Sequence, residues 1–369
     1  MDGADFIIIG GGIAGLSAAA RLSMRGKVIV LEAEEALGYH SSGRSVSFSH
    51  YGIGNGVVRA LTRLSRPFFE SQPEGFCETP IATLFPSLYF ADEEHLSLLD
   101  TLEANMARLA DTLEPLDAAG LTRVCPVIRT GPGAALRGFL DPTGLKLDAD
   151  ALLQSFARAL RAHGGEIRLG HRVGTIERKG GAWVVDDAVS APVLINAAGA
   201  WCDRIAALAG VTPLGLEPKR RTIIAVDPGT DMTGWPFVHS AAGDFYMLAE
   251  AGRLLVSPVD EVPDEACDAQ PDDYDIAFAA DRLEHYTTLK VSRIAHRWAG
   301  LRTFTRDRTP TAGFDPDAPG FFWLCGQGGY GLQTAPAMAA AVEALVTGGA
   351  WPLSGLSAAQ IAPARLLAG

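Results

Sequence analysis

The chain has 369 residues, of which 48% are hydrophobic and 20% charged, and its formal net charge is −12. These values are typical of a globular protein with one or two domains. The acidic balance argues against nucleic acid and anionic membranes as main partners, although local arginines can still bind an anionic substrate. No apolar run reaches the roughly 20 residues that a membrane-spanning helix needs, so we expect no integral membrane segment.

The five cysteines are far apart in the sequence and never form a C-x-x-C pair. This spacing predicts neither a disulfide framework nor a zinc site, and we expect no metal site of any kind. A reducing compartment is favoured, and no signal peptide is expected before the first strand. We therefore expect a cytoplasmic protein, and leave open a peripheral contact with the inner membrane.

Residues 5–32 predict a βαβ unit. The short apolar run at residues 6–9 is typical of a strand that is buried on both faces. Residues 13–25 are rich in alanine and leucine and predict a helix. A second apolar run at residues 28–31 predicts another strand, which ends on Glu32.

Three glycines with the spacing G-x-G-x-x-G connect the first strand to the helix. Gly10 allows a sharp turn, Gly12 lets a pyrophosphate approach the backbone, and Gly15 lets the helix pack closely on the strands. The helix N-terminus favours phosphates, and Glu32 lies where an acid accepts hydrogen bonds from a ribose diol. The unit therefore predicts a site for the ADP moiety of FAD or NAD. The alternative is a glycine-rich turn in an ordinary α/β fold.

A polar loop follows Glu32, at the edge of the sheet where ligands lie in open α/β folds. Its hydroxyls, amides and single arginine suit the diphosphate or another part of a cofactor, although an ordinary turn explains them equally well. The residues concerned are Ser41, Ser42, Gly43, Arg44 and Ser45.

Helices and strands alternate in the next part of the chain. Helices are expected over residues 57–70, 93–113, 149–162 and 202–209, and Asp148 is expected to cap the third. Strands are expected over residues 81–90, 165–178, 182–185 and 193–196. Small residues between Asn196 and Trp201 would let a flat or bulky group approach the end of the last strand.

From residue 213 onward the pattern favours antiparallel strands, with one helix over residues 273–289. Together with residues 46–145, this part predicts a second, mixed β domain. Near the C-terminus a strand at 320–325 precedes a second G-x-G-x-x-G and an alanine-rich helix at 335–346. No second strand with a terminal acid follows. We therefore expect this helix N-terminus to bind another electron-rich part of the same cofactor.

Four segments together resemble the flavoprotein family of D-amino-acid oxidase, glycine oxidase and sarcosine oxidase. They are DFIIIGGGIAG with Glu32, GYHSSGRS, VLINAAGAW and GQGGYGLQTAP. Within this family, the runs GFCE, NAAGAWCD, PLGLEPKRR and WAGLRTF are most similar to the bacterial FAD-dependent D-arginine dehydrogenases.

The resemblance implies an α/β fold with non-covalently bound FAD. A Rossmann-type domain with a mostly parallel sheet would comprise residues 1–45, 146–211 and 306–369. A mixed, largely antiparallel β domain for the substrate would comprise residues 46–145 and 212–305, and would cover the reactive face of the flavin.

The resemblance also implies which residues bind FAD. The first glycine turn and Glu32 would bind the ADP half, Val173 the adenine, and the second glycine segment the flavin. The full set is Gly10, Gly12, Ile13, Ala14, Gly15, Glu32, Ala33, Ser41, Ser42, Gly43, Arg44, Ser45, Val173, Ala198, Gly199, Trp201, Gly328, Gly329, Tyr330, Gly331, Leu332, Gln333 and Thr334.

Arg221 and Arg302 would hold the substrate carboxylate, and Tyr246 would donate a hydrogen bond to it. A guanidinium is a planar, permanently charged group that suits a carboxylate. Donors near Gly329 and Tyr330 would stabilise the reduced flavin. Without the resemblance, two solvated surface arginines and a core tyrosine explain the same residues.

The chain departs from the D-arginine enzymes at three positions of the expected pocket. Ser87 stands where those enzymes have an acid for the substrate guanidinium, and Ile53 and Phe48 stand in place of a tyrosine and a histidine. A buried guanidinium without a partner is costly, so we expect neutral or apolar D-amino acids rather than D-arginine. His50 and Tyr51 remain as polar contacts of the pocket.

The predicted activity is the FAD-dependent oxidative deamination of a D-amino acid to a 2-oxo acid and ammonia, with the electron acceptor left open. One alternative is an oxidase that acts on glycine, sarcosine or another amine and uses oxygen. Another is a 2-hydroxy acid oxidoreductase, for which His50 is the candidate base. A non-catalytic flavin-binding protein and an NAD-dependent dehydrogenase are also considered.

Overall fold

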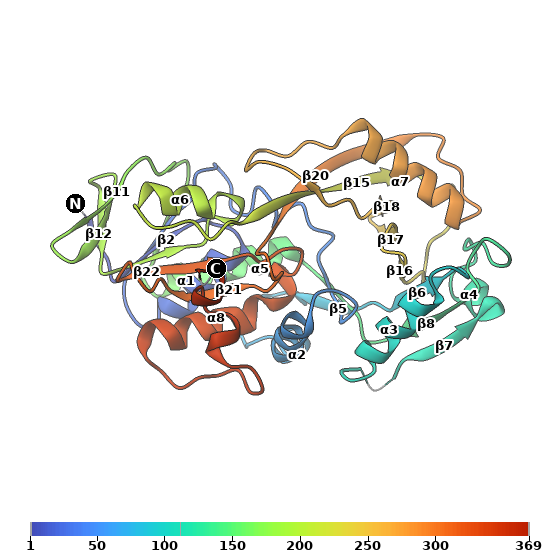
Figure 1. Ribbon diagram of the computed structural model, residues 1–369, viewed down its shortest axis with the longest axis horizontal. Coiled ribbons are helices and arrows are strands. Elements are labelled where there is room, and N and C mark those ends of the chain that lie inside the picture. The colour runs from blue at the N-terminus through green and yellow to red at the C-terminus, as the bar shows by residue number, and fades with distance from the viewer. Residues whose placement is uncertain (1, 111, 368–369) are drawn as a thin grey trace.

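The computed structural model describes residues 2–110 and 112–367. The fold is α/β and is built around two large sheets, one in the left half of Figure 1 and one in the right half. Five strands of the left-hand sheet are parallel, and its edge strand β21 is antiparallel. The strand order of this sheet is β10 (Glu166–Arg168), β3 (Val28–Leu31), β2 (Phe6–Ile9), β14 (Val193–Asn196), β22 (Phe321–Cys325) and β21 (Thr311–Phe314).

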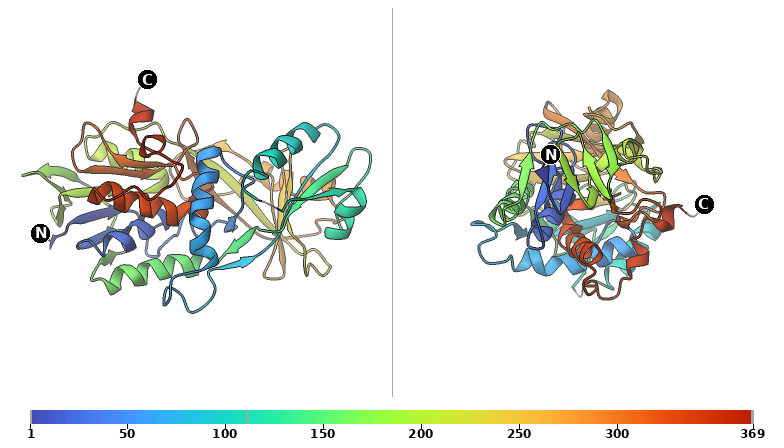
Figure 2. Two further views of the ribbon diagram at one scale, coloured as in Figure 1. Left: turned by 90° about the horizontal axis from the view of Figure 1, so that it is seen from below. Right: turned by 90° about the vertical axis from the view of Figure 1, so that its left-hand side faces the viewer.

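Both faces of the six-stranded sheet are covered, which explains why its central strands read as continuous apolar runs. Ile8 and Ile195 point to one face, where they pack against three helices; Figure 2 shows these helices along one side of the sheet. Ile7 and Leu194 point to the opposite face. The three helices are α1 (Ile13–Leu22), α5 (Ala149–Ala162) and α8 (Gly331–Thr347).

A smaller sheet and a helical segment cover the opposite face. Trp183 and Val185 of the small sheet pack on this face, and so does Cys202 at the start of α6. The strand order of the small sheet is β1 (Asp2–Gly3), β13 (Val189–Ala191), β12 (Ala182–Val185) and β11 (Ile176–Lys179). The helical segment consists of η1 (Gly199–Trp201) and α6 (Cys202–Leu208).

The second large sheet has nine strands and is mixed, because β16 and β6 are parallel while the other pairs are antiparallel. Strand β20 (Ile294–Phe304) pairs along β15, outside the linear order. That order is β19 (Val262–Pro263), β15 (Glu217–Val226), β18 (Arg253–Ser257), β17 (Tyr246–Glu250), β16 (Phe237–Ser240), β6 (Ser87–Ala91), β8 (Arg137–Asp141) and β7 (Glu114–Asp117).

The two faces of the nine-stranded sheet have different neighbours. Helices α7 (Asp273–Tyr286) and α4 (Ala118–Val124) pack on the face that carries Leu88 and Val238. The opposite face carries Tyr89 and Phe237. It is covered by α3 (Leu96–Met106) and by a three-stranded sheet, with the order β4 (Phe48–Ser49), β9 (Leu145–Leu147) and β5 (Ala82–Leu84).

Helix α2 (Gly56–Glu70) lies between the two halves of the molecule (Figure 2). The side chain of Asn55 caps it by accepting hydrogen bonds from the amides of Val57 and Val58, at 3.1 Å each. Leu61 packs into the core under the six-stranded sheet. Helix α2 belongs to residues 46–145, which the sequence predicts to be part of the substrate domain, yet it packs against the six-stranded sheet of the predicted FAD-binding domain.

The last elements of the described chain are η2 (Ala358–Gln360) and α9 (Ala364–Leu367).

Several predicted elements differ from those in the structure. The strand expected over residues 81–90 is divided at Pro86, which has no amide to donate to a sheet. The strand expected over 165–178 is two strands of different sheets, and Gly170 between them has φ of 63°. The helix expected over 93–113 ends at Met106, and residues 114–124 form a strand and a short helix that the sequence pattern did not indicate.

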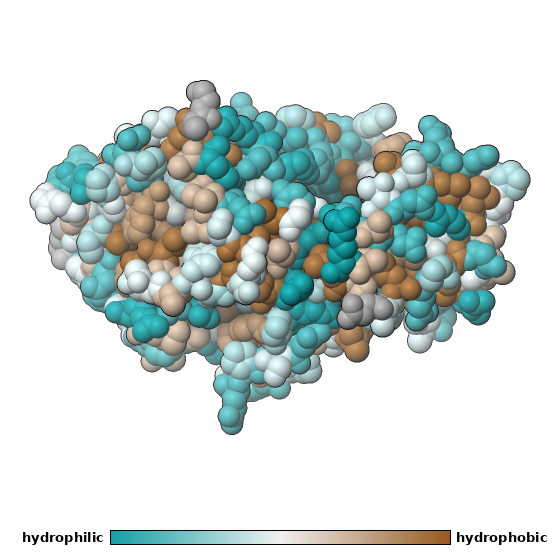
Figure 3. Space-filling model, turned by 60° about the horizontal axis from the view of Figure 1, so that its bottom comes forward, coloured by the Kyte–Doolittle hydropathy of each residue, from teal (hydrophilic) through white to brown (hydrophobic). Residues whose placement is uncertain are grey.

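The surface is mixed in character. On the face shown in Figure 3, hydrophobic residues lie among hydrophilic ones in both halves of the molecule. Within the described residues, no helix combines the length and the apolar character needed to cross a membrane.

The close packing of α1 on β2 depends on Gly15. A Cβ atom added there would lie 2.0 Å from the carbonyl oxygen of Gly10. We expect Gly15→Ala to lower the free energy of unfolding by at least about 2 kcal/mol, measured by denaturant titration. Gly56→Ala is the control, because a Cβ there meets nothing within 4 Å and should stabilise α2 slightly. Equal stability of Gly15→Ala and wild type would contradict this packing.

Candidate active site

An elongated cavity extends from the carboxyl ends of β2 and β3 to the nine-stranded sheet. It is lined by most of the residues that the sequence analysis selected, from segments that are far apart in the chain. These lining residues are Gly10, Gly12, Ile13, Ala14, Glu32, Ala33, Ser41, Ser42, Arg44, Ser45, Val173, Ala198, Gly199, Trp201, Arg221, Tyr246, Arg302, Gly328, Gly329, Gly331 and Leu332.

The first glycine turn forms one end of the cavity. Gly10 has φ of 113°, and an added Cβ would lie 2.4 Å from the carbonyl oxygen of Ala197, so only glycine fits. At Gly12 the nearest atom to an added Cβ is the Ser42 hydroxyl, at 3.3 Å. That hydroxyl accepts a hydrogen bond from the amide of Ile13 at 3.0 Å, at the start of α1.

The carboxylate of Glu32 is fixed at the cavity wall by two main-chain amides. One oxygen accepts a hydrogen bond from Gly11 at 2.6 Å, and the other accepts one from Glu34 at 2.9 Å. Farther along the wall lie Val173 and the His40 ring, whose centroid is 4.6 Å from that of Trp201. This end therefore combines a fixed acceptor with flat side chains.

The second glycine segment, residues 326–331, forms the middle of the cavity wall and leads into α8. The amide of Gly328 donates to the carbonyl oxygen of Thr303 at 2.8 Å, which ties this segment to β20. The buried Nε2 of Gln327 has no hydrogen-bond partner among the described residues, and Gln327 lines the cavity. The sequence analysis did not select Gln327, although it lies inside the second glycine motif.

Arg221 and Arg302 lie together at the far end of the cavity because of how their strands pair. Arg302 on β20 is opposite Lys219 on β15, two residues from Arg221, so both arginines point to the same face of the sheet. A Cβ on Gly329 would lie 2.7 Å from Nη1 of Arg302. A glycine at that position therefore makes room for the Arg302 guanidinium, which has no hydrogen bond or ion pair within the described part of the chain.

The Arg221 side chain is buried, and neighbouring acids hold one side of it. Its Nε donates to the carbonyl oxygen of Asp260 at 2.8 Å, and its Nη2 lies 3.5 Å from Oε1 of Glu261. Burial and then the charge of Arg302 lower the pKa of Arg221 to about 10. Two guanidinium groups at one end of a cavity favour an anion between them.

Tyr246 completes this end of the cavity. Its buried hydroxyl has no hydrogen-bond partner among the described residues, and the residue lines the cavity. Ile223 and Val46 are also in the wall here, and they belong to an apolar cluster with Phe48 and Phe237. An unsatisfied buried hydroxyl is costly, so a ligand that accepts its hydrogen bond is expected.

Arg44 has a different position from the one expected at a diphosphate. It lines the cavity, but its guanidinium forms an ion pair with Asp268 and donates to the carbonyl oxygens of Ala269 and Ala299, at 3.0 Å each. These contacts use its donors, so in this structure Arg44 fixes the loop against β20.

Nine of the selected residues are not in the cavity wall. They are Gly15, Gly43, Phe48, His50, Ile53, Ser87, Tyr330, Gln333 and Thr334. Seven of these residues are buried, Ile53 is half-buried and Gly43 is exposed.

The surroundings of three of the buried residues show how they are placed behind the cavity wall. The Phe48 ring lies against Phe237, with centroids 4.6 Å apart, and the buried Ser87 hydroxyl has no hydrogen-bond partner among the described residues. Tyr330 packs with Phe304 and Ile53. The structure therefore gives the expected pocket residues a supporting position, and their direct contact with a substrate stays a prediction.

His50 is buried, and Nδ1 lies 2.6 Å from the hydroxyl of Tyr89. Its ring stacks on that of His239 at 5.0 Å. Burial, and then the charges of Arg302 and Arg59, lower the pKa of His50 to about 3. A buried neutral imidazole behind the wall gives little support to His50 as a base for a 2-hydroxy acid.

The family model of the DAO proteins, described as FAD dependent oxidoreductase, matches residues 5–345. The chain belongs to this family. It is an FAD-dependent oxidoreductase, as the resemblance implied. The more specific similarity to D-arginine dehydrogenases stays a prediction.

Individual relatives agree with the family. Glycine oxidase from Pseudomonas putida is 26% identical over 369 residues, which cover 93% of this chain and 94% of that protein. FAD-dependent oxidoreductase domain-containing protein 1 from Xenopus laevis is 28% identical over 192 residues, which cover 46% of this chain and 37% of that protein. The crystal structure of L-proline dehydrogenase from P. horikoshii has the same fold, with a TM-score of 0.85, 19% identity and coverage of 99% and 98%.

The residues present fit FAD. The open backbone at Gly12 and the fixed carboxylate of Glu32 suit a pyrophosphate and a ribose diol. The unpartnered amide of Gln327 offers a donor beside the second glycine segment, where a ring with polar edges needs one. The cavity is long enough to connect these groups with the two arginines.

The buried histidines should make stability depend on pH. Burial lowers the pKa values of both His50 and His239, so both stay neutral in the folded protein and gain protons only on unfolding. The contribution of these neutral histidines to the free energy of unfolding is complete above pH 6.5. It is lost as the pH falls below this value, and for His50 the loss continues toward pH 3. We expect His239→Phe to reduce the stability difference between pH 8 and pH 5.5, measured by urea unfolding, by on the order of 1 kcal/mol.

Wild type, unfolded in urea at the same pH values, is the reference for this experiment. If His239→Phe and wild type lose the same stability between pH 8 and pH 5.5, His239 does not stay neutral in the folded protein.

Proposed function

We propose that the protein catalyses the FAD-dependent oxidative deamination of D-amino acids with neutral or apolar side chains. The observation that carries this proposal is the meeting of Arg221, Arg302 and Tyr246 at one end of the cavity. The D configuration rests on the resemblance described above, and the fold itself is shared with enzymes of other amino acids and amines.

The three residues suit the carboxylate of an amino acid. The Arg302 guanidinium has no other partner in the described chain, and Nε of Arg221 is held by the carbonyl oxygen of Asp260. A carboxylate between the two cations would neutralise their mutual repulsion and accept a hydrogen bond from Tyr246. Such a contact fixes one end of the substrate, and positioning of this kind supplies much of the rate in reactions that need little acid–base assistance.

The surroundings of the arginines favour an apolar substrate side chain. Val46 and Ile223 lead from the cavity into the cluster around Phe48 and Phe237. The acids that line the cavity, within the described residues, are Glu32 and Glu34, and both lie at the opposite end. A substrate guanidinium would therefore be buried here without a carboxylate partner in the wall.

Bound in the cavity, FAD would supply the acceptor for the hydride of the substrate Cα–H bond. The protein's own part is to hold the carboxylate with Arg221, Arg302 and Tyr246 and to exclude water from the apolar side-chain region. The imino acid product then reacts with water to give a 2-oxo acid and ammonia. In this proposal, FAD is held without a covalent bond.

A second candidate is an oxidase of glycine or sarcosine that uses oxygen. The similarity to the glycine oxidase of Pseudomonas putida over 93% of the chain supports it. The two candidates share the carboxylate contact and differ in substrate size and in electron acceptor. Hydrogen peroxide formed in air, measured per mole of product, distinguishes them.

The proposal is tested by mixing the FAD-loaded protein with amino acids in the absence of oxygen and recording the loss of flavin absorbance. We expect D-leucine, D-methionine or D-phenylalanine to bleach the flavin faster than D-arginine, and their L-forms to have no effect. Bleaching by glycine and sarcosine alone would favour the second candidate. No bleaching by any amino acid would contradict both.

Arg302 offers the cleanest substitution, because no partner within residues 2–110 and 112–367 is left unpaired when it is removed. We expect Arg302→Met to raise the KM for the amino acid about 10- to 100-fold through loss of charge-assisted hydrogen bonds, with FAD still bound. Arg253→Met, which removes a surface ion pair with Asp227, is the matched control and should leave KM unchanged. Loss of the flavin from Arg302→Met would assign Arg302 to the cofactor.

A further inference from the structure

A carboxylate outside the cavity wall lies between two arginines. Glu261 forms a two-point ion pair with Arg308, with Nη1 to Oε2 at 3.0 Å and Nη2 to Oε1 at 2.8 Å. The same Oε1 atom is 3.5 Å from Nη2 of Arg221, which is longer than a hydrogen bond. Glu261 therefore stands next to the proposed carboxylate site but is directed toward Arg308.

Arg308 is held in a defined direction. Its backbone has φ of 57°, a conformation that is uncommon for residues other than glycine. Its guanidinium carbon lies 3.9 Å from the centre of the Phe304 ring, in a cation–π contact. The hydrogen bond with Glu261 raises the pKa of Arg308, and Arg308 in turn helps to hold the pKa of Glu261 below its usual value although burial acts to raise it.

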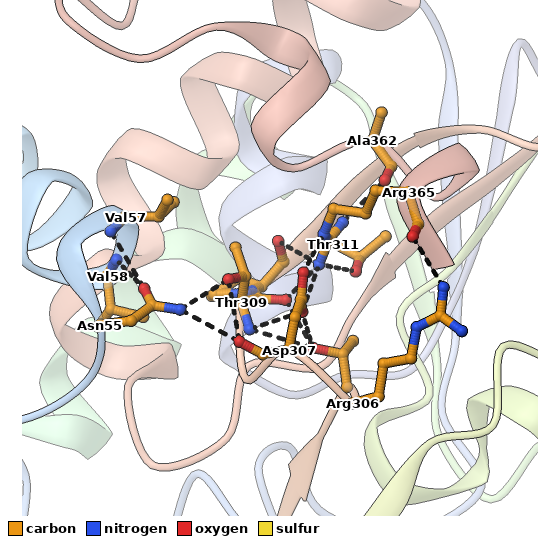
Figure 4. A network of polar contacts seen from close by, with 11 residues as sticks. Asn55, Val57, Val58, Arg306, Asp307, Thr309, Thr311, Ala362 and Arg365 are labelled. Atoms are coloured by element: carbon orange, nitrogen blue, oxygen red, sulfur yellow. Dashed lines mark hydrogen bonds and ion pairs between the residues drawn. The ribbon is translucent and has the colours of Figure 1, made fainter. Parts of the chain in front are cut away.

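The loop that carries Arg308 is fixed by a network of polar contacts, shown in Figure 4. Asp307 accepts hydrogen bonds from the Thr305 hydroxyl at 2.8 Å and from Nε of Arg365 at 2.8 Å. Asn55 donates to the Thr309 hydroxyl at 2.7 Å. The loop is thus tied to the start of α2 and to α9, and Arg308 projects from a rigid support.

The position of Glu261 matters because Arg221 has few N–H groups left to donate to a substrate carboxylate. Its Nε is used by Asp260, so its remaining N–H groups are those available to a substrate. Arg302 adds a second positive charge close by, which attracts any mobile carboxylate. A Glu261 side chain released from Arg308 needs to move by less than an ångström to form a hydrogen bond with Arg221, and would then compete with the substrate for the same cation.

We propose that Arg308 is a positioning residue that keeps Glu261 from forming a hydrogen bond with Arg221 and so keeps the carboxylate site open. The proposal rests on the proposed function, because it assumes that Arg221 binds the substrate carboxylate. Arg308 and Glu261 act without touching the substrate. Arg308 restrains Glu261, whose carboxylate is hydrogen-bonded to Arg308 and makes only a longer ion-pair contact with Arg221.

The test compares Arg308→Met, Glu261→Gln and the double variant, with Arg308→Lys as the conservative variant. Methionine keeps apolar contact with Phe304 while removing the charge. The probe is anthranilate, a carboxylate without a Cα–H to donate, titrated into the FAD-loaded protein while flavin absorbance is recorded. KM and kcat for the amino acid are measured in parallel, and retained colour and melting temperature report correct folding.

We expect Arg308→Met to weaken anthranilate binding and raise KM by about 5- to 10-fold, with kcat little changed. Glu261→Gln should bind anthranilate at least as tightly as wild type. The double variant should return to within about threefold of wild type, because the competing carboxylate is gone. Arg308→Lys should retain most of the wild-type affinity.

Two results would overturn the proposal. Arg308→Met with wild-type affinity would show that Glu261 needs no restraint, and a double variant as weak as Arg308→Met would show that Arg308 acts through the loop structure alone. If wild type binds neither anthranilate nor any amino acid, the proposed function fails first and this proposal fails with it. Failure confined to the variants leaves the proposed function intact.

Discussion

The arrangement depends on two positively charged side chains that are held together at the end of a cavity. Arg221 is buried, and this burial, followed by the charge of Arg302 next to it, lowers the pKa of Arg221 to about 10. Like charges in a partly dry site are unfavourable unless an anion or nearby acids compensate them. Among the described residues, the acids near Arg221 are Asp260 and Glu261, and neither lines the cavity, so an anion on the cavity side would complete the compensation.

The fold explains how these two charges come together. The antiparallel pairing of β15 with β20 places Arg221 and Arg302 on one face, two residues apart along the ladder. The glycine at position 329 then lets the start of α8 approach the Arg302 guanidinium. The proposed FAD site at the six-stranded sheet and the proposed carboxylate site at the nine-stranded sheet would therefore be linked through the segment between β22 and α8.

Much of the fold and the use of FAD could be predicted from the sequence. The βαβ unit with Gly10, Gly12 and Glu32 could be predicted from local sequence alone, because its strand, turn, helix and acid are contiguous in the chain. The class of fold and the use of FAD, expected from the resemblance, are confirmed by the family match. Local patterns were less reliable between residues 81 and 124, where Pro86 and short elements interrupt the expected strand and helix.

The relationships that the sequence could not show are those between distant segments. No local signal indicates that Glu261 lies between Arg221 and Arg308, or that the guanidinium of Arg44 is used by Asp268. The layer of Phe48, His50 and Ser87 behind the cavity wall likewise depends on how β4 covers the nine-stranded sheet. Motif matching places such residues near a site, and three-dimensional packing decides whether they face it.

The central claim is that the paired arginines bind a carboxylate over the cofactor, and a crystal structure of the FAD-loaded protein with anthranilate tests it directly. We expect the carboxylate oxygens within hydrogen-bond distance of Arg221 and Arg302, with the Tyr246 hydroxyl as a third donor. Anthranilate bound elsewhere, with both guanidinium groups turned away from it, would contradict the account.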